Sequence, residues 1–74
     1  MTHAQTANAM IRTDLKDAGF EAVENMNGGT RVELYNRPIS TLEIATALRE
    51  AGYSHSQFRT SRIQEYVIVE AVTS

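Results

Sequence analysis

Two six-residue segments of this 74-residue chain follow the same pattern of residue types. Leu15–Phe20 and Leu48–Tyr53 both run leucine, base, acid, alanine, glycine, aromatic. A glycine directly after a periodic apolar segment is typical of a helix end, because glycine adopts positive φ angles without steric cost. Each segment therefore predicts the end of a helix and the start of an extended region.

Apolar residues at spacings of three and four precede both glycines, as on one face of a helix. The first helix is expected over residues 2–18, with the stripe Ala4, Ala7, Ile11, Leu15 and Ala18. The second is expected to begin after Ser40 and to end near residue 51, with the stripe Ile44, Ala45, Leu48 and Ala51. Ser40 followed three residues later by Glu43 predicts a capping box at its start.

A strand pattern follows each predicted helix. Asn27-Gly28-Gly29 supplies the positive φ angles of a hairpin turn between the segments 20–27 and 30–36. After the second helix, a polar strand over 57–62, a turn near 61–64 and the β-branched and aromatic run 66–69 predict a second hairpin.

The predicted order is therefore helix, strand, strand, repeated once. We expect one domain of α+β class, αββαββ, with two helices packed on one face of a four-stranded, mostly antiparallel sheet. The first αββ unit spans residues 1–36 and the second spans 37–74. Either an internal duplication or a common helix-to-strand junction used twice explains the repeated pattern, and both lead to the same fold.

Composition excludes several classes of function. With no cysteine, the chain cannot form disulfides, thiolate zinc sites or a cysteine nucleophile. Seven basic and nine acidic residues give a net charge of -2, which argues against a polybasic nucleic-acid binder. No apolar run approaches the ~20 residues of a membrane span, and no basic-then-apolar leader is present. We therefore expect a cytoplasmic protein that makes no membrane contact.

No pattern in the sequence predicts catalysis, a metal site or a cofactor. The two histidines, His3 and His55, lie far apart, and neither has the spacing of a helical metal-binding pair. Ser54-His55-Ser56 places hydroxyls beside an imidazole, but adjacent residues of an extended segment point to opposite sides. We expect a protein that is not an enzyme.

The last predicted strand is apolar on both sides. If the helices cover Val67 and Val69, then Tyr66 and Ile68 lie on the opposite face of the sheet, near Tyr35. A strand that is apolar on both faces is usually covered on both. We therefore predict a protein-binding surface made by Tyr35, Tyr66, Ile68 and Phe58, with a second copy of the chain, as a homodimer, among its partners. One or two tolerated apolar residues at the surface are the simpler explanation.

Residues 54–64 support an alternative function, nucleic-acid binding, because they hold two arginines and no acid. Arg59 and Arg62 could bind phosphates, and His55 lies close by in sequence, so the segment could bind nucleic acid. An edge strand kept polar to prevent pairing between sheets explains the same composition. The leading hypothesis is a small regulatory protein, comparable in size and style to inhibitors made by phages and mobile elements.

Overall fold

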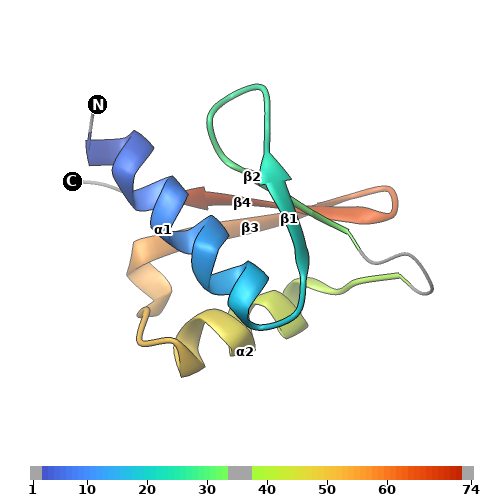
Figure 1. Ribbon diagram of the computed structural model, residues 1–74. Helices are drawn as coiled ribbons and strands as arrows, with labels where there is room; N and C mark the ends of the chain where they lie inside the picture. Colours follow the sequence, from blue (N-terminus) through green and yellow to red (C-terminus); the bar gives the residue numbers. More distant parts are fainter. Residues whose placement is uncertain (1–2, 34–37, 73–74) are drawn as a thin grey trace.

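A computed structural model describes residues 3–33 and 38–72 of the chain. Its elements are α1 (His3–Asp17), β1 (Glu21–Glu24), β2 (Thr30–Glu33), α2 (Thr41–Glu50), the 3₁₀ turn η1 (His55–Gln57), β3 (Phe58–Ile63) and β4 (Tyr66–Ala71). Figure 1 shows both helices on one side of the sheet. The αββαββ order and the α+β class are confirmed.

The four strands form one antiparallel sheet in the order β1-β2-β4-β3. The second strands of the two units, β2 and β4, pair at the centre, with Val32 opposite Val67. The strands of the two units occupy equivalent positions in the sheet: β1 and β3 are at the edges, and β2 and β4 are at the centre. A two-fold axis between β2 and β4 would relate the units in this way. The similarity between the two halves of the sequence therefore has a counterpart in the sheet.

Both helices end in the same hydrogen-bonded motif. After α1, Gly19 has φ +97° and the amide of Phe20 donates to the carbonyl of Leu15 over 3.0 Å. After α2, Gly52 has φ +107° and the amide of Tyr53 donates to the carbonyl of Leu48, also over 3.0 Å. These are Schellman motifs, in which a left-handed residue lets the chain leave the helix while its last carbonyls stay bonded. The predicted helix ends are confirmed.

The start of α2 also agrees with the sequence. The Oγ atom of Ser40 accepts a hydrogen bond from the amide of Glu43 over 3.2 Å, which satisfies a helix donor that lacks an intrahelical partner. Ile39 and Ile44 are both fully buried on either side of this cap. Apolar residues at these two positions form the hydrophobic staple that fixes the direction in which the chain enters a helix.

The two hairpins turn differently. In the first, a loop over residues 25–29 closes with the amide of Asn25 donating to the carbonyl of Gly29 over 2.9 Å. In the second, the turn predicted near residues 61–64 lies slightly later, because β3 continues to Ile63 and the turn consists of Gln64 and Glu65. Gln64 has φ +54°, the left-handed conformation that a two-residue hairpin turn requires.

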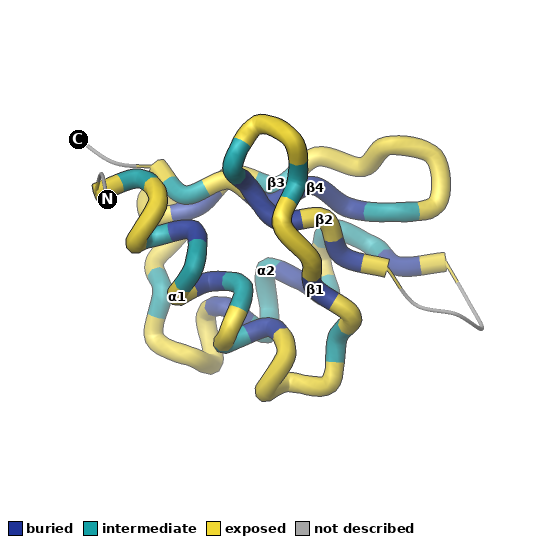
Figure 2. Tube along the Cα trace, turned by 45° about the horizontal axis from the view of Figure 1, so that its top comes forward, coloured by how far each residue is buried: buried dark blue, intermediate teal, exposed yellow. Residues whose placement is uncertain are grey.

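The core lies between the helices and the inner face of the sheet, where Figure 2 shows the buried segments of α1, α2 and the central strands facing one another. Its buried residues are Ile11, Leu15, Ala22, Val32, Ile39, Ile44, Leu48, Phe58, Val67 and Val69. Ala18 and Ala51, the last residues of the two predicted stripes, are exposed. No helix among residues 3–33 and 38–72 is long and apolar enough to cross a membrane.

One buried polar side chain joins the two ends of the described chain. Asn8 donates through Nδ2 to the carbonyl of Ala4 over 2.8 Å, and its Oδ1 accepts from the amide of Ala71 over 2.8 Å. Both hydrogen-bonding functions of the buried amide are therefore satisfied, as burial requires. The contact holds α1 against the end of β4.

Candidate interaction surfaces

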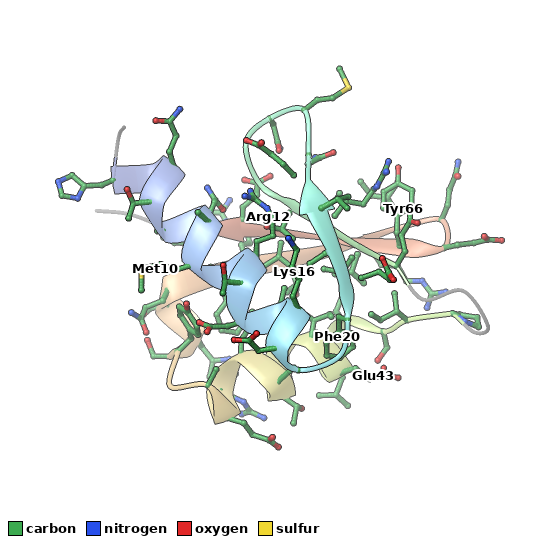
Figure 3. All side chains as sticks on the ribbon, in the orientation of Figure 1. Met10, Arg12, Lys16, Phe20, Glu43 and Tyr66 are labelled. Carbon is green, nitrogen blue, oxygen red and sulfur yellow. The ribbon has the colours of Figure 1, made fainter. Side chains whose placement is uncertain are left out.

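The face of the sheet away from the helices, called the open face below, receives alternate residues of each strand. In β4, Val67 and Val69 are fully buried in the core, whereas Ile68 does not belong to the core cluster. Across the sheet, Ile68 lies opposite Arg31 on β2 and Ser61 on β3. Figure 3 shows the labelled Tyr66 on the side of the molecule away from α2. Tyr66 and Ile68 thus lie on the face on which the sequence placed them.

Side chains on the open face contact one another, so part of this face is shielded from solvent. The guanidinium carbon of Arg31 lies 5.6 Å from the centre of the Tyr66 ring, and its Nε lies 3.2 Å from Oε1 of Glu33. Ile68, beside Arg31, is only 5% exposed. The apolar residues that this face offers to solvent are instead Val23, 43% exposed, and Ile63, 44% exposed. These two residues lie on the two outermost strands.

Two further residues of the predicted surface do not contribute to it as expected. Phe58 is 7% exposed and packs in the core, because it lies opposite Ala71 on the helix side of the sheet. This corrects its placement on an interaction surface. Tyr35 lies outside the described residues.

The residues of the predicted nucleic-acid site are divided between surfaces. Arg59 lies opposite Glu70 on the open face, whereas Arg62 lies opposite Val67 on the helix side. Residues an odd number of positions apart on a strand point to opposite faces. His55 lies in η1, where its Nε2 is 3.2 Å from Nη1 of Arg49. The structure therefore does not gather these three side chains into one basic patch.

The two edges of the sheet carry opposite charges. β1 reads Glu-Ala-Val-Glu, with both acids, Glu21 and Glu24, exposed and no base. β3 reads Phe-Arg-Thr-Ser-Arg-Ile, with both arginines, Arg59 and Arg62, exposed and no acid. The arginines of β3 are evident from the sequence, whereas the acidic edge formed by β1 was not predicted. Which strands lie at the two edges depends on the strand order, and local residue patterns do not specify that order.

A groove of about 740 Å³ lies between the two helices on the opposite side of the molecule. Among the described residues that line it, the charged ones are all acidic, namely Asp14, Asp17, Glu43 and Glu50. Its apolar lining includes Phe20, which Figure 3 labels together with Glu43, another lining residue. Leu42, 69% exposed, also lines the groove.

Tyr53 packs against this helix pair and carries the one large pKa change in the described residues. Its hydroxyl donates to Oδ2 of Asp14 over 2.6 Å. Desolvation by burial, followed by the hydrogen bond and the negative charge of Asp14, raises the pKa of Tyr53 from 10.0 to about 12. The phenol therefore stays protonated and links the end of α2 to α1.

The described residues contain no cluster of three or more histidine, cysteine or acidic side chains that could hold a metal ion. The Ser54-His55-Ser56 segment is also not arranged as a nucleophile and base. The two serine Oγ atoms lie 3.0 Å from each other, and the ring nitrogen of His55 contacts Arg49. The hydroxyls and the imidazole thus have other partners, and the geometry offers no activated serine.

No protein-family model, curated protein or solved structure matches this chain. The proposals below therefore depend on the surfaces just described.

Proposed function

We propose that this chain is a small, non-enzymatic protein that binds another protein, including a second copy of itself, through the part of its sheet that the helices leave uncovered. One observation carries the proposal: Tyr66 and Arg31 lie on the open face with the exposed Val23 and Ile63 on its two outermost strands. Tyrosine and arginine are frequent anchors of protein interfaces, and apolar neighbours add area that favours burial.

A regulatory or inhibitory role in the cytoplasm is part of this proposal. The chain has no cysteine, so it uses none of the disulfides that small proteins of oxidising compartments commonly need. Its core has ten buried apolar residues in the described part of the chain, and an additional interface would add apolar burial to that small core.

Light scattering over a concentration series tests the proposal. We expect the apparent mass of the wild-type protein to rise with concentration, and the double variant Val23→Lys, Tyr66→Lys to remain a monomer. Leu42→Lys is the matched control, because Leu42 is an exposed apolar residue on the helix side. Circular dichroism checks that each variant keeps the wild-type fold. A wild-type monomer at every concentration, or a double variant that associates like the wild type, contradicts self-association through this surface.

Nucleic-acid binding receives less support from the geometry, because Arg59 and Arg62 point to opposite faces and Phe58 is buried. Retention on heparin or on mixed oligonucleotides at low salt separates the two functions. We expect no retention. Salt-sensitive retention that is lost in Arg59→Ala, Arg62→Ala would favour nucleic-acid binding instead.

A further inference from the structure

We propose that copies of this chain associate edge to edge, with β1 of one copy pairing with β3 of the next to continue the antiparallel sheet. This inference rests on the proposed self-association and places its contact at the outer strands of the open face, where the exposed Val23 and Ile63 lie. β1 and β3 are the two outer strands of the sheet, and each pairs with one neighbour only. An edge strand presents unpaired backbone donors and acceptors, which are a template for another strand.

The strand directions permit this contact. Each step across β1-β2-β4-β3 is antiparallel, so β1 and β3 run in opposite directions. Placing β1 of a second copy beside β3 therefore adds one more antiparallel step. In that arrangement the helices of both copies lie on the same side of the extended sheet, so the open faces also form one continuous surface.

The charges favour contact between β1 of one copy and β3 of another, and they oppose contact between two β1 strands or two β3 strands. Two β1 strands would bring Glu21 and Glu24 against the same acids, and two β3 strands would bring arginines together. Only the pairing of β1 with β3 places acids beside arginines. Within the described residues, the side chains of Glu21, Glu24 and Arg59 make no ion pair, and Arg62 donates only to the carbonyl of Gln64 over 3.3 Å. These charges are therefore available to a partner.

One register keeps the faces aligned and pairs the end of β1 with matching residues of β3. Val23 lies on the open face and Glu24 on the helix side, since Val23 pairs with Arg31 and Glu24 with Thr30. Ile63 and Arg62 have the same two orientations on β3. An antiparallel alignment with Val23 opposite Ile63 therefore puts Glu24 opposite Arg62. It pairs two exposed apolar side chains on one face and two opposite charges on the other. In the same alignment Val23 and Glu24 are the β1 residues that face β3 directly, and Glu21 extends past its end to the turn residue Glu65.

The contact uses different surfaces on the two partners, so one copy keeps a free β1 edge and the other keeps a free β3 edge. Such head-to-tail contacts produce rings when the rotation closes and open chains when it does not. β1 has only four residues, so each contact contains few hydrogen bonds. We therefore expect assembly that grows with protein concentration and weakens as salt is added, because exposed charges are screened within about 3 Å at 1 M salt and about 30 Å at 0.01 M.

Two charge-reversed variants provide the decisive experiment. Glu21→Arg, Glu24→Arg makes both edges basic, and Arg59→Glu, Arg62→Glu makes both edges acidic. Alone, each variant should remain a monomer in light scattering at low salt, under conditions in which the wild-type protein associates. Mixed in equal amounts, they should recover the wild-type apparent mass, at least twice that of either variant alone. Asp17→Arg, Glu50→Arg is the control, because it makes the same charge change on exposed helix residues and should leave the association intact.

The outcomes separate this inference from the function on which it rests. If the wild-type protein associates but the single variants associate equally well, or if the mixture does not recover the wild-type mass, the edge-to-edge arrangement is wrong and self-association through another surface remains. If the wild-type protein is monomeric at low salt, both the edge-to-edge arrangement and the proposed self-association are wrong. Circular dichroism of each variant excludes unfolding as the reason for a lost contact.

Discussion

The two αββ units join helix to sheet in the same way but build their hairpins differently. Both junctions are Schellman motifs with the same two hydrogen bonds. The first hairpin has four-residue strands and a five-residue loop, whereas the second has six-residue strands and a two-residue turn. Six local residues therefore determine each helix-to-sheet junction, whereas each hairpin depends on the chemistry of its turn. The units consequently share a scaffold and present different edges.

The largest effect is expected where the two units are most alike. Leu15 and Leu48 occupy the same position of the two motifs, and both are fully buried. Truncating a buried leucine to alanine removes apolar burial and leaves a cavity, at a cost of about 2–5 kcal/mol. We expect Leu15→Ala and Leu48→Ala to lower the free energy of unfolding by similar amounts in urea titrations. A much smaller loss at one position would show that its unit contributes little to the core.

The glycines of the junctions should give intermediate effects. Gly19 and Gly52 have positive φ angles, and an added Cβ atom at either would meet no atom within 4 Å. Alanine there costs only the strain of the left-handed conformation, about 1–2 kcal/mol. We expect Gly19→Ala and Gly52→Ala to lower the thermal midpoint equally. Gln64→Gly, which relieves a positive φ in the second hairpin, should not lower it, and a large loss there would contradict this account.

The smallest effect should come from the aromatic residue that differs between the motifs. Tyr53 donates a hydrogen bond to Asp14, and Phe20, at the equivalent position, has no hydroxyl. Because the pKa of Tyr53 is raised from 10.0 to about 12, the folded state holds the phenol proton more tightly than the unfolded state. That contribution to stability is present below pH 10 and is lost as the pH rises towards 12.

Thermal unfolding of Tyr53→Phe across this pH range tests the contribution. The variant should be less stable than the wild type at neutral pH and should lose less stability between pH 10 and 12. Phe20→Tyr is the matched control, since it adds a phenol at the other motif. An unchanged alkaline profile in Tyr53→Phe would mean that the hydrogen bond to Asp14 does not stabilise the fold.

The sequence predicted the features that short segments determine. The two glycines and the Ser40 cap marked helix ends correctly, because each depends on residues within one helical turn. The alternation in β4 placed Val67 and Ile68 on the correct faces. The same alternation, applied to Arg59 and Arg62, would have shown that they cannot share a face.

Features that depend on distant parts of the chain were not predictable in this way. The pairing of β2 with β4 joins segments from different units, and no local pattern specifies it. The neighbour of Ile68 on β2 also depends on that pairing, because the pairing places Arg31 opposite Ile68. The charges of the sheet edges were not predictable either. The strand order is needed to show that Glu21 and Arg59 lie on outer strands.

The last strand of the chain lies in the middle of the sheet, and this position affects the order in which the fold can form. During synthesis, α1 and the first hairpin leave the ribosome before β4 exists, so the central partner of β2 and the amide that Asn8 binds are both missing. The contact between Asn8 and Ala71 spans 63 residues, and such long-range contacts slow folding. Nascent chains should therefore expose the inner edge of β2 until β4 has been synthesised, and chains truncated before residue 66 should aggregate rather than fold.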